Sequence, residues 1–405
     1  MKKSYESSNY FNFLQQDGAE TLTVIFSARN DRAPKFTFWK MGNRLNSHVI
    51  FLNSEVPAWY RLGIPGIPGG IRGAVKKILD FKNHVGAKRL VMLGSSMGAY
   101  GALLYGALAK ADHVLAFGVE PILGIPGGKT EVTRNEYQYI YPDLTCLNIP
   151  PSTIFYGGMD INDILGAWLL KSRKGSRILC IPEAQHDTPD FLVKYEQLEN
   201  IFNDLVAGRE ISSFGYSSGD ACNDVVTKYL WGLNNDLVEK KWLNIKRRYE
   251  EMRLEVEVSC IAKYLYGISL FRLNYFKDAL SILSELVLVL PKYWELWMNI
   301  SACQAKLGNL DSAINSASKA ISLRPHRSIA HAQISGIYLK QGNLNKAHLH
   351  ALWACKLNYS RPEYMKSLTE ISRKMNLEIP VINDLQNEYI KNVKLAQDTF
   401  KNYFV

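Results

Sequence analysis

The sequence predicts a chain in two parts: an α/β domain built on a mostly parallel sheet, then an all-α domain of stacked helical repeats. In the first half, short apolar runs typical of buried strands alternate with helical patterns, an order that indicates βαβ units. In the second half, alanines recur at Ala279, Ala313 and Ala347, a spacing of 34 residues. The two patterns predict two different architectures in one chain.

Length and charge limit the classes of partner. A chain of 405 residues with 47% hydrophobic residues is long enough for two or three domains, each with its own core. The net charge of +10 favours anionic partners such as acidic glycans, nucleic acid or a membrane surface, although a solvated basic surface explains it equally well. The densest basic cluster, residues 240–248, has no nucleic-acid-binding motif. We therefore expect no specific nucleic-acid partner.

The cysteines and the N-terminus indicate the compartment. Six cysteines are scattered without a C-x-x-C pair, so the sequence predicts neither a metal site nor a disulfide framework, and a reducing compartment fits best. Lys2 and Lys3 are not followed by the apolar core of a signal peptide, and no apolar run reaches transmembrane length. We expect a cytoplasmic protein without a transmembrane segment.

The first half reads as alternating strands and helices. Strands are expected over residues 21–26, 36–39, 48–52, 90–93, 114–117, 153–156 and 177–181, and helices over 71–85, 99–108, 165–170 and 191–206. A loop rich in Gly and Pro covers residues 59–70, and Gly124–Gly128 is a second candidate for a small lid. Aromatic residues in the first loop form either a packed cover or part of a substrate pocket, so Trp59 and Tyr60 are candidate substrate-binding residues.

The strand-to-helix junction at residues 94–98 carries the clearest chemical motif. Gly94-Ser95-Ser96-Met97-Gly98 fits G-x-S-x-G, the pattern of a nucleophile elbow. The two glycines let a strained turn close while the Ser96 hydroxyl points outward, and the N–H of Met97 at the helix N-terminus faces the place where an oxyanion would form. Ser95 is the competing hydroxyl, but it occupies the x position. We predict Ser96 as a nucleophile.

Two more strand ends supply a base and an acid. His186 follows the last strand and is the candidate general base, whereas His48, His84 and His113 lack this placement. Asp160 follows the preceding strand and is predicted to orient the histidine. Asp163, in the same turn, and Asp187 are the alternatives, and an acidic residue after a strand can instead cap the next helix.

The order Ser96, Asp160, His186 is that of the α/β-hydrolase superfamily, which residues 20–206 resemble. The resemblance implies an α/β-hydrolase fold and a second oxyanion N–H from the loop after an early strand, where Ser27 and Ala28 stand. In finer detail this half looks similar to hydrolase-like proteins of bacterial surface-glycan loci. Some of these are esterases and others are sugar O-acetyltransferases.

The second half resembles the tetratricopeptide repeat. Pro291 and Pro325, like Gly308 and Gly342, share the 34-residue step, so three repeats cover about residues 260–360 of an all-α tetratricopeptide-repeat solenoid. Trp294 and Trp297 have the spacing of repeat core, and no metal site is expected at the H-x-H of residues 348–350.

These patterns predict three segments. The α/β-hydrolase domain covers residues 1–206, a linker with a Ser and Gly cluster covers 207–240, and the repeat domain covers 241–405, with capping helices from Glu378 onward. The resemblance implies a groove for a protein or peptide partner, and the basic composition favours an acidic one.

Together these features predict an enzyme in which Ser96 forms an acyl-enzyme that water or a sugar hydroxyl then resolves. The substrate would be an acyl ester or a glycan; hydrolysis needs no cofactor, and a transferase would take acetyl-CoA as an acyl donor. The alternative is a non-catalytic scaffold in which only the repeats act. A complete set of Ser, His and Asp favours the enzyme.

Overall fold

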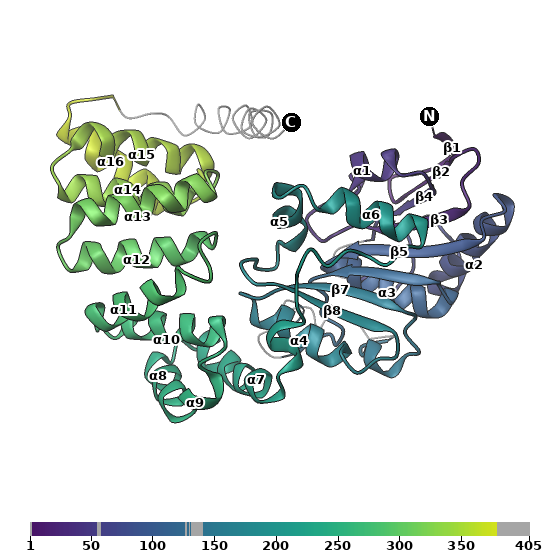
Figure 1. Cartoon of the computed structure of the whole chain (residues 1–405). Coiled ribbons are helices and arrows are strands. Elements are labelled where there is room, and N and C mark those ends of the chain that lie inside the picture. Colours follow the sequence, from purple (N-terminus) through teal and green to yellow (C-terminus); the bar gives the residue numbers. More distant parts are fainter. Residues whose placement is uncertain (1, 55–57, 126–127, 129, 131–140, 379–405) are drawn as a thin grey trace. The chain divides into compact units, whose positions relative to one another are not determined.

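The computed structural model describes residues 2–54, 58–125, 128, 130 and 141–378 (Figure 1). The chain forms two compact units, Met1–Lys240 and Lys241–Val405. Within the described residues, no helix has both the length and the apolar character needed to cross a membrane.

The first unit is built on one mixed sheet. Its order is β1-β2-β4-β3-β5-β6-β7-β8, with β4, β3 and β5 to β8 parallel and β1 and β2 antiparallel. The strands are β1 (Lys3–Ser7), β2 (Phe11–Gln15), β3 (Thr21–Phe26), β4 (His48–Leu52), β5 (Arg89–Ser95), β6 (His113–Phe117), β7 (Ser152–Gly157) and β8 (Ser176–Ile181). The sequence predicts six of these strands and the mostly parallel sheet, but not β1 and β2.

Helices cover both faces of this sheet (Figure 1). Alternation along β5 decides which side chains meet which helices, because successive residues of a strand point to opposite faces. Val91 and Leu93 share a core with residues of α5 and α6. Met92, on the other side, lies near Gly106 of α3. The helices are α1 (Trp39–Arg44), α2 (Gly70–His84), α3 (Met97–Ala109), α4 (Ile161–Leu170), α5 (Thr188–Lys194) and α6 (Leu198–Ala207).

Two expected elements differ in the structure. Residues 36–39 form no strand, because the chain turns at Phe38, which has a positive φ of 57°, and enters α1. Its neighbour Phe36 still packs against Phe51, so the aromatic character of this segment serves the core rather than a sheet. Residues 191–206 form two helices instead of one, since Glu196 has a φ of 57° and interrupts the helical backbone between α5 and α6.

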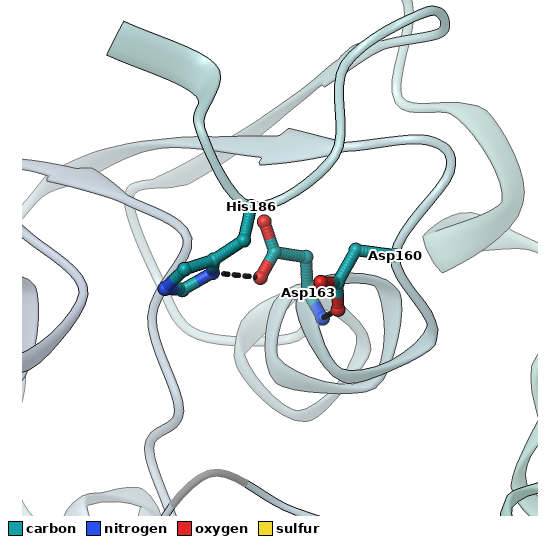
Figure 2. A group of neighbouring side chains, drawn as sticks. All are labelled: Asp160, Asp163 and His186. Atoms are coloured by element: carbon teal, nitrogen blue, oxygen red, sulfur yellow. Dashed lines mark hydrogen bonds and ion pairs between the residues drawn. The ribbon is translucent and has the colours of Figure 1, made fainter. Parts of the chain in front are cut away.

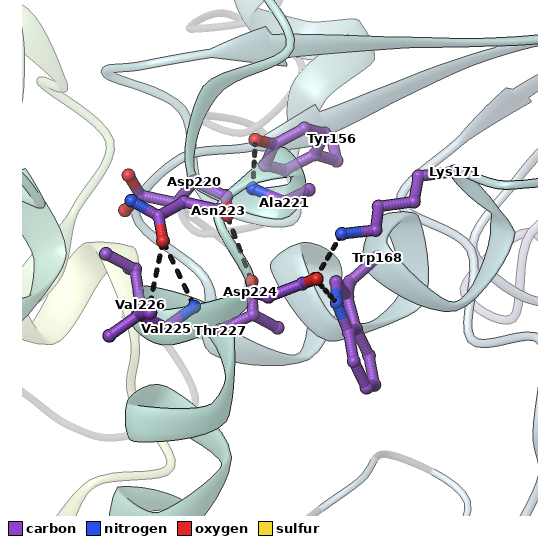
Figure 3. Close-up of polar contacts among 10 residues, drawn as sticks. All are labelled: Tyr156, Trp168, Lys171, Asp220, Ala221, Asn223, Asp224, Val225, Val226 and Thr227. Carbon is purple, nitrogen blue, oxygen red and sulfur yellow. Dashed lines mark hydrogen bonds and ion pairs between the residues drawn. The ribbon is translucent and has the colours of Figure 1, made fainter.

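The segment 207–240, predicted as a linker, belongs to the first unit. It contains a 3₁₀ turn, η4 (Gly219–Cys222), and helix α7 (Asp224–Val238). The Tyr156 hydroxyl donates to Ser218 O at 2.6 Å. It also accepts a hydrogen bond from Ala221 N at 3.1 Å, and Trp168 Nε1 donates to the Asp224 carboxylate at 2.7 Å (Figure 3). Lys171 forms an ion pair with the same carboxylate. These contacts tie the segment to β7 and α4, so the first unit extends through residues 207–240 instead of ending at residue 206, and the second unit begins at Lys241, the predicted first residue of the repeat domain.

The second unit is a solenoid of helical hairpins with the 34-residue period. Three hairpins follow α8 (Trp242–Glu251) and α9 (Arg253–Val256), and a further helix, α16 (Pro362–Lys374), comes after them. The hairpins are α10 (Cys260–Arg272) with α11 (Phe276–Leu286), α12 (Trp294–Lys306) with α13 (Leu310–Leu323), and α14 (Ser328–Lys340) with α15 (Leu344–Leu357).

The repeat also appears in side-chain contacts. Ser301 Oγ donates to Ala313 O and Ser335 Oγ to Ala347 O, both at 2.7 Å and both fully inside the unit. Small residues at these crossings let the paired helices approach closely, as the tetratricopeptide pattern predicts. The solenoid is therefore tetratricopeptide-like in its contacts as well as in its period.

Aromatic residues of the second unit lie largely as their spacing predicts. Trp294 is buried and Trp297 is half-buried. His348 Nε2 lies 3.2 Å from Ser372 Oγ, whereas His350 stacks on His331 and Tyr338, so the two histidines meet different neighbours. The predicted capping helices lie outside the described residues, apart from Glu378, as do Pro126 and Gly127 of the second predicted lid.

Candidate active site

The predicted elbow lies at the carboxyl end of β5. The strand ends at Ser95, α3 begins at Met97, and Ser96 between them has φ 56° and ψ −120°, a strained conformation for a residue with a side chain. Glycine is required on both sides. A Cβ on Gly94 would lie 2.1 Å from Gly98 O, and a Cβ on Gly98 would lie 2.2 Å from Phe26 O. Close packing of the turn against β3 therefore fixes the position of Ser96.

A chain of hydrogen bonds connects Ser96 to a buried carboxylate. His186 follows β8, and its Nε2 lies 2.8 Å from Ser96 Oγ. Its Nδ1 lies 2.6 Å from Asp163 Oδ1 (Figure 2). The Asp163 side chain is 2% exposed, and its other oxygen accepts a hydrogen bond from Gly157 N at 3.2 Å. The arrangement can move a proton from the serine hydroxyl to the imidazole, with the carboxylate holding the ring in one orientation.

The carboxylate that contacts His186 belongs to Asp163. The sequence analysis preferred Asp160 for this position and named Asp163 as an alternative. Asp160 is the N-cap of α4, and its Oδ1 accepts a hydrogen bond from Asp163 N at 3.1 Å (Figure 2). The helix therefore begins at Ile161, and Asp163 lies in its first turn, where its side chain reaches His186. The prediction that Asp160 contacts the histidine was wrong, because Asp160, the first acidic residue after β7, caps the N-terminus of α4.

The oxyanion site also differs from expectation. Met97 is the first residue of α3, so its N–H has no acceptor within the helix, as the predicted role in an oxyanion site requires. Ser27 N instead donates to Leu52 O at 2.9 Å, and Ala28 N donates to Thr37 Oγ1 at 2.7 Å. The two N–H groups that were candidates for the second oxyanion donor are thus engaged in hydrogen bonds that stabilise the loop after β3.

Trp59 and Tyr60 have different surroundings. Trp59 lines the narrow pocket at Ser96 and packs edge-on against Tyr100. Tyr60 is fully buried, and its hydroxyl donates to Ser27 O at 2.9 Å. Burial raises the pKa of Tyr60 well above its usual value. Tyr60 packs in the core behind the loop. Trp59 is only 2% exposed, so its contact with a substrate stays a prediction.

The pocket contains residues that the sequence analysis did not single out. Gly118, Val119, Glu120 and Asn162 line it together with the residues already named. The buried Glu120 carboxylate accepts a hydrogen bond from the Thr130 hydroxyl at 2.6 Å. Residues 118–120 directly follow β6, so the rule that sites gather at the carboxyl ends of parallel strands was sufficient to find them.

Three side chains at the site could also offer ligand atoms to a metal ion. Asp160, Asp163 and His186 each place one such atom within 4.8 Å of the others. However, both nitrogens of His186 and both oxygens of Asp163 take part in the hydrogen bonds described above. Metal binding would break the connection to Ser96, so the arrangement fits proton transfer better.

Comparison with known proteins adds little about this site. No family model and no curated protein matches the chain. Among solved structures, the chain is similar to the type III secretion chaperone SycD of Yersinia enterocolitica in complex with a peptide of the translocator YopD, with 19% identity over 28% of this chain and 92% of that one (TM-score 0.27). It is also similar to MamA from Desulfovibrio magneticus RS-1, with 15% identity over 44% of this chain and 97% of that one (TM-score 0.36).

Gly118→Ala should disturb the hydrogen bond between His186 and Asp163. Gly118 has a φ of 57°, and an added Cβ would lie 2.9 Å from His186 Nδ1 and 3.0 Å from Asp163 Oδ2. The backbone strain alone costs about 1–2 kcal/mol, and the ring must also move. We expect a lower free energy of unfolding and loss of the downfield proton resonance of a histidine hydrogen-bonded to a carboxylate, measured by NMR.

Gly86→Ala is the matched control. Gly86 also has a positive φ, 66°, but no neighbouring atom lies within 4 Å of an added Cβ. It should destabilise the first unit by a similar backbone term and leave the downfield resonance unchanged. Equal spectra for the two variants would contradict the placement of Gly118 against the histidine.

Proposed function

We propose that the first unit is a serine acyl-ester enzyme. The observation that carries this proposal is the continuous hydrogen-bond chain from Ser96 Oγ through His186 to the buried carboxylate of Asp163. A serine that only stabilised a turn would not need a strained backbone, a histidine at its hydroxyl and a carboxylate behind that histidine. The strand order, with these three residues after β5, β8 and β7, supports the resemblance to α/β-hydrolases.

The chemistry follows from the geometry. Ser96 Oγ attacks the carbonyl carbon of an ester while its proton passes to His186 Nε2. The N–H of Met97 and the positive end of α3 stabilise the negative charge that develops on the carbonyl oxygen. The imidazolium then protonates the leaving alcohol or thiol as the bond to the carbonyl carbon breaks, which leaves an acyl-enzyme.

The acceptor that removes the acyl group from Ser96 defines the class of enzyme. Water as acceptor makes the protein a carboxylic-ester hydrolase, and a sugar hydroxyl makes it an O-acyltransferase on a glycan, with acetyl-CoA as an acyl donor. A narrow pocket favours a short acyl group such as acetyl. Trp59 and Val119 offer apolar contacts to that group, and the Glu120 carboxylate can accept hydrogen bonds from sugar hydroxyls.

Ser96→Ala should lower turnover of p-nitrophenyl acetate by about a thousandfold or more, since acyl-enzyme formation requires the hydroxyl. A fluorophosphonate probe should label Ser96, as located by peptide mass spectrometry, and labelling should be much weaker in His186→Ala. Ser95→Ala is the matched control and should keep most activity. Labelling at Ser95, or wild-type turnover in Ser96→Ala, would show that the nucleophile is misassigned.

The two neighbouring aspartates should differ in effect. Asp163→Asn removes the carboxylate that orients His186 and should lower kcat by up to about ten-thousandfold with little change in KM, as for the corresponding substitution in a serine protease. Asp160→Asn keeps a good N-cap and should leave kcat within about tenfold of wild type. Steady-state kinetics on both variants tests this order, and a larger loss in Asp160→Asn would reverse the assignment.

We further propose that the second unit holds a protein or peptide partner. Helical-repeat solenoids present extended surfaces for binding. On this one, large apolar side chains remain exposed: Tyr275, Leu288, Val289, Ile329, Leu349 and Trp353. A scaffold role and an acyl-ester enzyme are compatible, since the repeats can bring the enzyme to its acceptor.

A chain that ends at Lys240 should keep kcat/KM for p-nitrophenyl acetate within about threefold of the full chain and lose efficiency toward a native glycan acceptor. This follows because the contacts of Tyr156 and Trp168 with residues 218–231 remain in it. A chain that ends at Val206 is the control and should be poorly soluble. An inactive chain ending at Lys240 would show that the repeats support the fold rather than recruit a partner.

A further inference from the structure

A second cavity lies at the other end of the sheet, where strands β5 to β8 begin. It encloses about 300 Å³, the lower end of the range for small-molecule pockets. Its walls come from the first residues of these strands and from the segment after α6. Ser96 and His186 lie beyond the carboxyl ends of the same strands, so this cavity is separate from the candidate active site.

Two arginines line the cavity from strands that are not neighbours. Arg89 opens β5 and Arg177 lies at the start of β8, with β6 and β7 between them. Strands in a sheet are about 4.8 Å apart, so the two backbones stand roughly 14 Å from one another. The two arginines therefore belong to backbones on opposite sides of β6 and β7, and both line the cavity.

Each guanidinium uses one nitrogen for a structural contact. Arg89 Nη1 donates to Leu205 O at 3.0 Å, at the carboxyl end of α6. Arg177 Nη1 donates to Ile211 O at 2.6 Å and lies 3.1 Å from a carboxylate oxygen of Glu210. Within the described residues, the Nε and Nη2 groups of both arginines have no protein acceptor, and a guanidinium carries five N–H donors in all. Most of this donor capacity remains for a ligand.

The cavity floor is polar and neutral. The ring nitrogen Nε2 of His113 lies 3.0 Å from Thr153 Oγ1, and Thr153 is buried. Burial, with a smaller effect of Arg89, lowers the pKa of His113 to about 4, so the ring carries no charge at neutral pH. Among the lining residues in the described part of the chain, Glu210 alone carries a carboxylate, and its side chain is 85% exposed. Arg209 is paired with Asp204. Positive charge thus dominates the lining.

We propose that this cavity binds a small polyanion whose charged groups pair with Arg89 on one side and Arg177 on the other. Guanidinium forks match phosphate and carboxylate oxygens geometrically, so a diphosphate or a dicarboxylate has the required chemistry. The hydroxyl of Thr153 and the neutral ring of His113 offer hydrogen bonds to the part between the two charges. A ligand with a single charged group reaches only one arginine and should bind more weakly.

Isothermal titration calorimetry on the full chain tests this proposal, with pyrophosphate, succinate and acetate as probes at equal ionic strength. Pyrophosphate or succinate should bind at least about tenfold more tightly than acetate, and the better of the two identifies the charged group. Arg89→Gln and Arg177→Gln should each weaken binding by about tenfold or more, because each removes charged hydrogen bonds. Arg72→Gln, an exposed position on α2, is the control and should bind like the wild type.

Arg89 and Arg177 also donate hydrogen bonds to Leu205 and Ile211, so replacing them with glutamine could destabilise the fold. Arg89→Lys and Arg177→Lys therefore serve as second variants, which keep the positive charge but replace the planar guanidinium with an ammonium group. Each should unfold at a temperature close to that of the wild type and still bind the polyanion more weakly. Equal affinity for polyanion and acetate would overturn the proposal, as would equal weakening by Arg72→Gln. Turnover of p-nitrophenyl acetate is measured in parallel and should not change, so the outcome is independent of the proposed esterase activity.

Discussion

The site depends on one close approach, that of the α3 N-terminus to strand β3. Gly98 lies so near Phe26 O that any side chain there would overlap it, and Gly94 lies equally near the backbone of Gly98. This packing leaves Ser96 in a strained conformation, and the strain is compensated by the buried core of β3, β5 and α3 around it. Because the turn cannot relax without separating the helix from the sheet, the serine hydroxyl is held at the carboxyl end of β5, within hydrogen-bonding distance of His186. The other parts of the site are positioned relative to this fixed point.

The two aspartates after β7 show what sequence can and cannot predict. That an acidic residue follows this strand, and that a histidine follows the next, could be predicted because parallel strands bring their carboxyl ends to one edge. Which aspartate contacts the histidine depends on the residue at which α4 begins, and helix boundaries are the least certain part of a prediction from sequence. A cap at Asp160 turns the next residues into the helix, and the side chain three positions later then points toward His186. If α4 began less than one turn earlier or later, a different aspartate would cap the helix and a different one would contact the histidine.

The remaining differences have the same origin in contacts between distant residues. Strand β2 exists because Phe11 to Leu14 pair with β4, about forty residues later, and the sequence of β1 is polar and exposed. The break at Glu196 has no glycine or proline to mark it. Ser27 and Ala28 could be placed after β3 from sequence, but their N–H groups are bonded to Leu52 and to Thr37, which local patterns do not reveal. The 34-residue repeat was more predictable, because each hairpin mainly contacts its neighbours in sequence.

The two ends of the sheet have different electrostatic characters, although the same strands form both. At the carboxyl ends, a serine, a histidine and one buried carboxylate form a chain suited to proton transfer. At the amino ends, two guanidinium groups with unused donors meet a neutral histidine. The strands hold these ends apart, since six residues of strand extend over roughly 20 Å. At that distance a unit charge changes the energy of another by less than about 1 kcal/mol for an effective dielectric constant of 20. An anion bound at one end would therefore leave proton transfer at the other largely unaffected, and each end can have a function of its own.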